Sequence, residues 1–136
     1  MDKMKIRDYL IKNEGLKLKP YRCTAGKLTI GVGRNLEDNG IAEKEALYML
    51  DNDIKGSISD LKIIFPNWIL ISPNRQMVLI DMRFQLGATR FRKFKVTIQA
   101  VKDENWVKAG RQIGNSLYAK QVPNRAKANI KLMVEG

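Results

Sequence analysis

The first apolar pattern along the chain is that of a short amphipathic helix. Between Met4 and Asn13, Ile6, Tyr9 and Leu10 recur at helical intervals, while most of the charged residues face the other side. The pattern stops near Glu14, just before a glycine, which is a common residue after a helix end. We therefore predict a helix over residues 4–13.

The next segment, Pro20 to Asn39, has the composition of extended strands and tight turns. It contains three glycines and the run Leu28–Val32, which suit a β-hairpin better than a helix. Residues 38–40, with the sequence Asp-Asn-Gly, predict a turn, and apolar residues return at helical spacing from Glu43 to Ile54. We expect one small β-hairpin region here, followed directly by a second helix.

The remainder of the chain has the pattern of packed helices. Ser72 and Pro73 are typical of a helix start and Gly87 of its end, and residues 74–86 between them are apolar on most sides, as in a helix buried in a helical lobe. The later apolar stripes are Phe91, Phe94, Ile98 and Val101; Trp106, Val107, Gly110 and Ile113; and, in a last helix that starts at Pro123, Ala126, Ile130 and Met133. The fold class that we expect is α+β, with a small N-terminal β-hairpin region packed against a mainly α-helical lobe.

Length and composition favour one globular domain, with 136 residues of which 44% are hydrophobic. No stretch approaches the roughly 18 consecutive apolar residues that a membrane span needs, so we expect no stable membrane insertion. Residues 2–8 are mostly charged where a secretion signal would need an apolar segment. We therefore expect the protein to remain in the cytoplasm in which it is made until something releases it.

The residue types that are missing restrict the possible chemistry. The chain has no histidine and one cysteine, Cys23, which excludes Ser-His-Asp and Cys-His catalysis and an intramolecular disulfide, and leaves too few ligands for zinc. We therefore expect no metal and no cofactor. The formal net charge of +11 favours a polyanionic partner, and nucleic acid, an anionic cell envelope and lipid headgroups all meet that condition.

Three residues near the N-terminus have side chains that could take part in catalysis. Glu14 ends the first predicted helix, Cys23 follows nine residues later in a polar loop, and Thr29 comes six residues after that on the predicted strand. A helix and a hairpin that meet at an angle would form a cleft. The sequence therefore suggests a site between these two elements.

This set lies within a longer series of blocks by which the chain resembles the phage lysozymes, typified by the lysozyme of the T-even phages. The blocks follow the family's order over nearly the whole chain and are Asn13–Leu16, Pro20–Tyr21, Gly26, Leu28–Gly33, Phe84–Gly87 and Pro123–Lys127. The resemblance implies a single lysozyme-like domain over residues 1–136, with a β-containing lobe at about 14–40 and a helical lobe at 41–136 that includes helix 4–13. The segment from Arg34 to Ile41 is much shorter than in the T-even enzyme, so we expect a trimmed β region.

The resemblance also implies an activity, the hydrolysis of the 1,4-β bond between N-acetylmuramic acid and N-acetylglucosamine in bacterial peptidoglycan, with inversion. Glu14 would protonate the glycosidic oxygen, and Thr29 would help to hold the attacking water. Cys23 stands where the best-studied member has aspartate, although members with cysteine there are also known. An inverting glycosidase needs one acid on the leaving group and a second group that activates water on the opposite face of the sugar.

The expected roles place demands on the surroundings of the two reactive side chains. Glu14 has to be protonated, which burial at the base of a cleft would favour and a nearby Arg125, as the resemblance suggests, would oppose. For Cys23, we expect Arg22 and the overall positive charge to lower the pKa of the thiol. A thiolate would orient water or attack the sugar directly, and the alternative for this residue is a small buried hydrophobic side chain.

Two interpretations stay open for each of the other expected site residues. Phe84 is either a contact to sugar at the edge of the cleft, as the resemblance implies, or a core residue of a very apolar helix. Thr97 and Gln112 match polar substrate contacts of the family, but an exposed helix position fits each of them equally well. Arg125 either holds Glu14 or is one more member of a basic face.

A cluster of basic residues with two interleaved aromatic residues is a pattern that nucleic-acid binders also have, and it comprises Arg90, Phe91, Arg92, Lys93, Phe94 and Lys95. Because the aromatic residues have the spacing of a helix core, we favour a solvated positive face around a packed stripe. We expect a monomer that acts on bacterial peptidoglycan and requires no nucleic acid. The alternatives are a catalytically weakened lysozyme fold and a basic module that binds a polyanion without turnover.

The resemblance also implies a place of action. A phage protein of this kind would accumulate in the host bacterial cytoplasm, and a separate membrane lesion would release it to the periplasm and the cell wall for host lysis. The positive charge fits this expectation, because bacterial envelopes are polyanionic.

Overall fold

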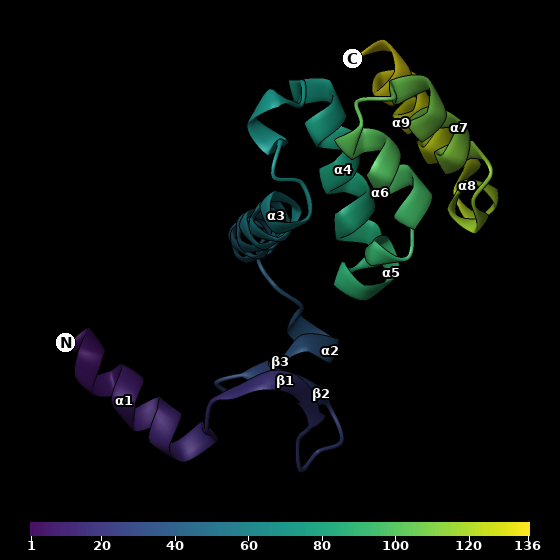
Figure 1. The fold of residues 1–136 in the computed structure, drawn as a ribbon. Coiled ribbons are helices and arrows are strands. Elements are labelled where there is room, and N and C mark those ends of the chain that lie inside the picture. The colour runs from purple at the N-terminus through teal and green to yellow at the C-terminus, as the bar shows by residue number, and fades with distance from the viewer. The chain divides into compact units, whose positions relative to one another are not determined.

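The computed structural model describes residues 1–136, which form two compact units, Met1–Tyr48 and Met49–Gly136 (Figure 1). The elements of the first unit are α1 (Lys3–Glu14), β1 (Lys17–Arg22), β2 (Leu28–Gly31), β3 (Arg34–Asn35) and α2 (Leu36–Asn39). Helix α3 (Glu43–Ile64) begins in the first unit and continues in the second, whose other elements are η1 (Trp68–Leu70), α4 (Pro73–Leu86), α5 (Ala88–Arg92), α6 (Lys95–Lys102), α7 (Trp106–Gly114), α8 (Leu117–Gln121) and α9 (Pro123–Glu135). The predicted α+β class is confirmed, and no helix is both long and apolar enough to cross a membrane.

Helix α1 confirms the first predicted element. Asp2 caps its start by accepting hydrogen bonds from the backbone N–H groups of Met4 and Lys5 at 3.0 and 3.2 Å. Gly15 ends the helix with a φ of +79°, a conformation that favours glycine. None of the side chains of α1 is buried, including those on its apolar face. The chain therefore leaves the helix immediately after Glu14 and turns into the sheet.

Strands β1, β2 and β3 form an antiparallel sheet in that order, with β2 in the middle. Thr29 of β2 pairs with Tyr21 on one side and Asn35 on the other, and it is only 3% exposed. The predicted hairpin is confirmed, but the sheet begins earlier, at Lys17, and gains a third strand. Thr29, a predicted site residue, is therefore buried in the central strand of the sheet.

A helical turn, α2, stands where the sequence predicted only a turn at residues 38–40. The side chain of Asn35 caps this helix by accepting a hydrogen bond from the backbone N–H of Asp38 at 3.1 Å. Gly40 ends it with a φ of +59°. Asparagine before a turn with acidic residues is a helix-start signal, so the sequence contained the information for this element.

Helix α3 starts at Glu43 as predicted but extends ten residues beyond the predicted end at Ile54. Gly56 lies in its interior, where glycine costs only about 1 kcal/mol relative to alanine. The complete burial of Leu61, worth about 1.5–3 kcal/mol, offsets that cost. The helix ends shortly before Pro66, which has no N–H and would clash with the preceding turn.

Helix α4 has the predicted start and end. The Ser72 hydroxyl accepts a backbone N–H of the first turn at 3.4 Å, Pro73 occupies the first position, and Gly87 ends the helix with a φ of +82°. Its buried residues are Val78, Leu79, Met82 and Leu86. Met77 and Phe84 are exposed, so the prediction of a helix buried on most sides is wrong.

The predicted stripe from Phe91 to Val101 belongs to two helices, α5 and α6, and Phe94 lies in the short segment between them. Phe91 and Val101 are buried, and Phe94 packs against the core, so the packed stripe expected within the basic cluster is confirmed. The short helix α8, which the sequence did not predict, starts at Ser116, whose hydroxyl accepts the Ala119 N–H at 3.3 Å.

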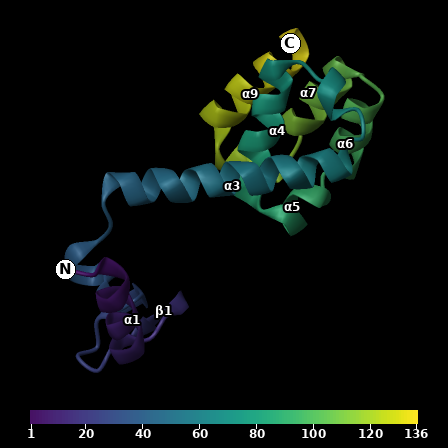
Figure 2. The same ribbon diagram turned by 90° about the vertical axis from the view of Figure 1, so that its left-hand side faces the viewer.

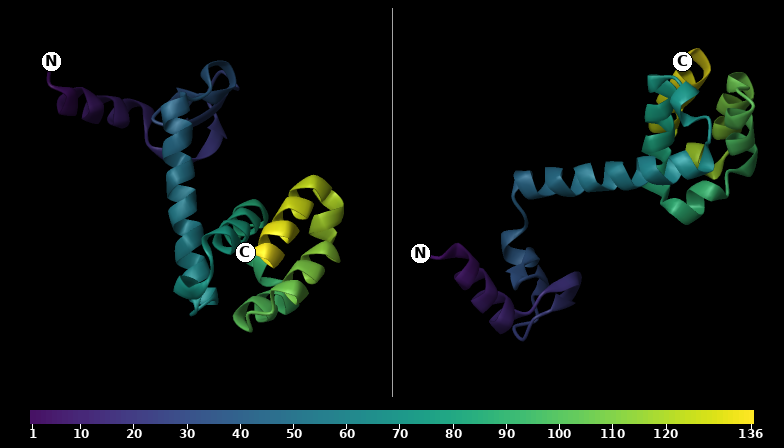
Figure 3. Two further views of the ribbon diagram at one scale, coloured as in Figure 1. Left: turned by 90° about the horizontal axis from the view of Figure 1, so that it is seen from above. Right: turned by 60° about the vertical axis from the view of Figure 1, so that its left-hand side comes forward.

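Helices α7 and α9 lie side by side in the second unit (Figure 3). Gly110 permits their close approach, because a Cβ atom at this position would lie 2.6 Å from the Val134 Cγ2 atom and 3.5 Å from that of Ile130. The predicted core residues Ile113 and Met133 are fully buried. The glycine in the predicted stripe of α7 is thus a packing requirement and not a helix end.

Asp60 connects the later part of α3 to α4 and α5, which lie close to it (Figure 2). Its Oδ2 atom accepts hydrogen bonds from Arg83 Nε at 2.7 Å and Arg92 Nη1 at 2.8 Å, and its Oδ1 atom also pairs with Arg92. The hydrogen bond from Arg92, with a smaller one from Arg83 and against the effect of burial, lowers the pKa of Asp60 to about 2. One carboxylate therefore pairs with two arginines and joins three helices.

We predict that this cluster makes the stability of the second unit depend on pH. Because folding lowers the pKa of Asp60 from 3.8 to about 2, its stabilisation is complete above that unfolded value and is lost as the pH falls through this interval. Asp60→Asn should therefore lower the free energy of unfolding at pH 7 by on the order of 1 kcal/mol, measured by urea denaturation, and flatten its decline in acid. Asp51→Asn, at an exposed position of the same helix, is the control, and an equal loss in both variants would contradict the prediction.

Candidate active site

Glu14 is the last residue of α1, and its carboxyl group lies against the turn between β2 and β3. A Cβ atom at Gly33 would come 2.7 Å from Glu14 Oε2 and 3.0 Å from its Cδ, so the carboxyl group occupies the space that a side chain would need. Gly33 also has a φ of +62°, which favours glycine. This glycine therefore lets an acidic side chain of the helix contact the backbone of the sheet.

Cys23 and Thr29 are joined through the backbone carbonyl of Lys27. This oxygen accepts a hydrogen bond from the Cys23 backbone N–H at 3.0 Å and another from the Thr29 hydroxyl at 2.8 Å. Gly26 tightens the turn by donating its N–H to the Cys23 carbonyl at 2.8 Å. Because the single hydroxyl proton of Thr29 goes to the carbonyl, its oxygen keeps free lone pairs that can accept a hydrogen bond.

The surroundings of Cys23 lower the pKa of its thiol. The largest cause is a hydrogen bond from the backbone of Lys27, followed by one from the backbone of Ala25, while burial opposes them. The prediction that Arg22 lowers this pKa is wrong, because its charge is engaged elsewhere. Backbone dipoles rather than a neighbouring cation favour the thiolate.

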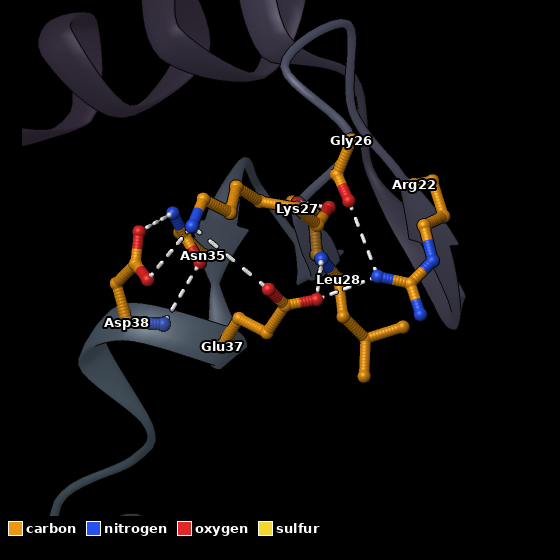
Figure 4. A network of polar contacts seen from close by, with 8 residues as sticks. Arg22, Gly26, Lys27, Leu28, Asn35, Glu37 and Asp38 are labelled. Carbon is orange, nitrogen blue, oxygen red and sulfur yellow. Dashed lines mark hydrogen bonds and ion pairs between the residues drawn. The ribbon is translucent and has the colours of Figure 1, made fainter.

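Arg22 belongs to a network around Glu37 that ties α2 to the hairpin (Figure 4). Its Nη1 atom lies 2.5 Å from Glu37 Oε1 and donates to the Gly26 carbonyl at 3.1 Å, and the Leu28 N–H donates to the same Glu37 oxygen at 3.2 Å. The ammonium group of Lys27 lies 3.9 Å from the other oxygen of Glu37. Glu37 was not among the predicted site residues, although the signal for it, an acidic pair after a basic hairpin, is in the sequence.

In the second unit, Thr97 of α6 and Gln112 of α7 line one cavity of about 320 Å³. Thr97 is 5% exposed and Gln112 is partly buried, so the alternative of two exposed helix positions is wrong. The other residues that line this cavity are Lys93, Phe94, Lys95, Val96, Asn115 and Ser116. Two residues that the sequence assigned to substrate binding thus share one hollow.

Phe84 lines a different cavity, of about 410 Å³, whose other lining residues are Asn52, Asp53, Gly56, Ser57 and Arg83. Its exposed fraction is 46%, so the interpretation of Phe84 as a core residue is wrong. The structure does not bring it into the hollow that Thr97 and Gln112 share. Its ring is free to contact a ligand.

Arg125 makes its ion pair within the second unit. Its Nε donates to Asp81 Oδ2 at 2.8 Å, and Asn129 donates to the same oxygen and to the Tyr118 hydroxyl, both at 2.9 Å. The hydrogen bond from Arg125 is the main cause of the lowered pKa of Asp81. Arg125 is therefore not a free member of a basic face, and its expected contact with Glu14 stays a prediction.

Comparison with protein families supplies the deciding observation. Residues 11–127, which include every predicted site residue from Glu14 to Arg125, match the family described as phage lysozyme. The chain belongs to the phage lysozyme family. The resemblance deduced from the sequence is confirmed, and the protein is a lysozyme-type glycoside hydrolase that acts on peptidoglycan.

The chain is similar in sequence to several other proteins. "Probable T4-type lysozyme 2" of Dictyostelium discoideum is 28% identical in an alignment of 164 positions, which covers 96% of this chain and 94% of the relative. "Pre-baseplate central spike protein Gp5" of Enterobacteria phage T4 is 28% identical in an alignment of 161 positions, which covers 98% of this chain and 28% of that protein. "Peptidoglycan hydrolase gp36" of Pseudomonas phage phiKMV is 44% identical over 55 residues, which cover 40% of this chain and 6% of that protein. The lysozyme-like region therefore extends over nearly the whole chain.

The contact between Glu14 and Gly33 leads to a prediction for this lysozyme. With Glu14 as the acid, Gly33→Ala should push the carboxyl group away and lower the rate of peptidoglycan hydrolysis by roughly 100-fold, since displacements of about 1 Å have effects of that size. Gly31→Ala is a matched control, because Gly31 has a φ of +69° but a Cβ atom there meets nothing within 4 Å. Circular dichroism should show that both variants are folded. If both then lost the same activity, backbone strain alone would explain the loss.

Proposed function

We propose that this lysozyme cleaves the 1,4-β bond between N-acetylmuramic acid and N-acetylglucosamine with inversion at the anomeric carbon, and that it does so in host cell lysis. The observation that carries the proposal is the hydrogen bonding of Cys23 and Thr29 to one carbonyl, that of Lys27, which keeps a base and a water-binding hydroxyl together. An inverting glycosidase needs such a pair in addition to its acid. Relatives in phages T4 and phiKMV support the phage setting.

Glu14 donates a proton to the glycosidic oxygen as the bond from this oxygen to the anomeric carbon breaks. Its position at the helix end and its contact with Gly33 restrict the carboxyl group from both sides. A positioned acid of this kind contributes typically about 10²–10⁴-fold to the rate. The donated proton stays on the leaving sugar as part of its new hydroxyl group.

Water attacks the anomeric carbon from the opposite face of the ring. The Cys23 thiolate, which the hydrogen bond from the Lys27 backbone favours, accepts one proton of this water. The Thr29 oxygen, whose own proton goes to the Lys27 carbonyl, accepts a hydrogen bond from the other proton and so orients the water. The thiol then releases its proton to solvent, from which Glu14 regains one.

The second unit supplies the substrate contacts in this proposal. Phe84 offers an exposed aromatic ring, and Thr97 and Gln112 offer polar groups in their shared cavity. Arg125 has a supporting role, and its ion pair with Asp81 holds its guanidinium in a fixed position. The protein acts as a monomer and needs neither nucleic acid nor a cofactor.

The role of Glu14 is tested by Glu14→Gln, which keeps the shape of the side chain but removes its transferable proton. We expect the release of reducing ends from purified peptidoglycan to fall by roughly 10³-fold at an unchanged melting temperature. Glu135→Gln is the matched control, since Glu135 is also the exposed last residue of a helix. An unchanged rate in the Glu14 variant would remove this residue from the mechanism.

The role of Cys23 is tested by the pH dependence of activity. The base must be deprotonated, so wild-type activity should be lost as the pH falls through the thiol pKa, which lies below its usual 9.0. Cys23→Asp should move this loss of activity to acidic pH, because a carboxyl group has a lower pKa than a thiol. Cys23→Ala should abolish this pH dependence and lower the rate roughly 100-fold.

Two results with these variants would contradict the proposal. Full activity in Cys23→Ala would show that the thiol is dispensable. An inactive wild type that gains activity only as Cys23→Asp would instead support a catalytically weakened lysozyme fold.

A further inference from the structure

Two peptide groups meet at Lys27 in the turn of the hairpin, and a side chain outside the turn holds each of them (Figure 4). The Gly26 carbonyl, which belongs to the first group together with the Lys27 N–H, accepts a hydrogen bond from Arg22 Nη1 at 3.1 Å. The Leu28 N–H, which belongs to the second group together with the Lys27 carbonyl, donates to Glu37 Oε1 at 3.2 Å. Arg22 and Glu37 are themselves paired at 2.5 Å, so one ion pair contacts both peptide groups.

The opposite ends of the same two peptide groups interact with Cys23 and Thr29. The Lys27 carbonyl accepts the Thr29 hydroxyl at 2.8 Å and the Cys23 backbone N–H at 3.0 Å. The Lys27 backbone, whose only donor is its N–H, is also the largest of the causes that lower the pKa of the Cys23 thiol. A peptide group is planar, so a contact that fixes one of its polar ends also fixes the direction of the other. The ion pair therefore restrains the groups with which both predicted site residues interact.

The two charges of the ion pair have the signs that strengthen these interactions. A guanidinium at a carbonyl oxygen polarises the peptide group so that its N–H is a better donor, and a carboxylate at an N–H makes the carbonyl of that group a better acceptor. Arg22 lies at the carbonyl of the first group and Glu37 at the N–H of the second. Neither residue is itself among the causes that shift the pKa of Cys23. Their influence on the thiol therefore passes through the peptide groups.

We infer that Glu37 is a positioning residue of this lysozyme, which holds the two peptide groups at Lys27 directly and through its partner Arg22. It thereby sets the arrangement of Cys23 and Thr29 for the attack of water. The inference rests on the proposed function, because it assigns a role within that same reaction. The alternative is an ion pair that only joins α2 to the hairpin.

The test compares Glu37→Ala with Glu37→Gln, in which an amide oxygen can still accept hydrogen bonds from Arg22 and Leu28. Asp38→Ala is the matched control, because it removes the same charge from the next position of α2, and Asp38 pairs with the ammonium group of Lys27 and not with its peptide groups. The side chain of Glu37 is 41% exposed, so the variants should remain folded, which melting temperatures check. Glu37→Met, which removes the acceptor but keeps most of the side-chain volume, replaces the alanine variant if that variant does not fold.

The first measurement is the pKa of the Cys23 thiol without substrate. Cys23 is the only cysteine of the chain, so the pH dependence of its alkylation by iodoacetamide reports this thiol alone. Glu37→Ala should raise the pKa of Cys23 toward its usual 9.0, because the Lys27 N–H loses its fixed direction. The loss of a negative charge would by itself lower this pKa, so the sign of the shift separates positioning from charge.

The second measurement is the rate of hydrolysis of purified peptidoglycan. Glu37→Ala should lower kcat about tenfold at an unchanged KM, because a misdirected base and hydroxyl affect the attack of water and not the binding of the glycan. Glu37→Gln and Asp38→Ala should stay close to the wild type in both measurements.

An unchanged or lowered thiol pKa in Glu37→Ala would overturn the inference, and so would an equal rise in Asp38→Ala. A thiol pKa in Glu37→Gln that matched the one in Glu37→Ala would also overturn it, since an acceptor at this position would then not suffice. A wild type that releases no reducing ends would overturn only the proposed function. The alkylation measurement needs no substrate and still decides whether Glu37 positions the thiol.

Discussion

The backbone carbonyl of Lys27 is the acceptor on which the arrangement of Cys23 and Thr29 depends. By accepting the Cys23 backbone N–H and the Thr29 hydroxyl at once, it ties the backbone of Cys23 to the side chain of Thr29. It also consumes the only proton of the hydroxyl, so that the Thr29 oxygen can act as an acceptor. The network around Glu37 fixes the same turn from its other side. The lowered pKa of the Cys23 thiol and the free lone pairs of the Thr29 hydroxyl thus both follow from the geometry of one hairpin.

Charge in this molecule is divided between two kinds of side chain. Arginines dominate the ion pairs, as with Arg83 and Arg92 around Asp60 and Arg125 beside Asp81, and they connect helices within the second unit. Their planar, multiply bonding heads suit such fixed geometry, whereas a lysine is a flexible point charge. Lys93 and Lys95 stay free at the edge of a cavity. The excess positive charge is therefore partly structural and partly available to an anionic substrate.

The parts of the fold that local signals determine were predictable from the sequence. Ser72 and Gly87 mark the ends of α4 because caps depend only on neighbouring backbone groups. The end of α3 was not predictable, since tertiary burial of Leu61 overrides the weak interruption at Gly56. For the candidate site, the family pattern selected Glu14, Cys23 and Thr29 as candidates. It did not predict that Arg22 pairs with Glu37, because a pairing between residues far apart in the chain leaves no periodic trace. The exposure of Phe84 was undecidable for the same reason.

In the proposed reaction, Cys23 and Thr29 hold a water molecule, and neither side chain attacks the sugar. Proton NMR of peptidoglycan fragments, recorded within seconds to minutes of cleavage, reports the configuration of the newly formed reducing end before it equilibrates. A water held opposite the Glu14 proton predicts that the α anomer of N-acetylmuramic acid forms first from the β-linked substrate. Initial formation of the β anomer would indicate a double displacement through a covalent intermediate and would contradict the account.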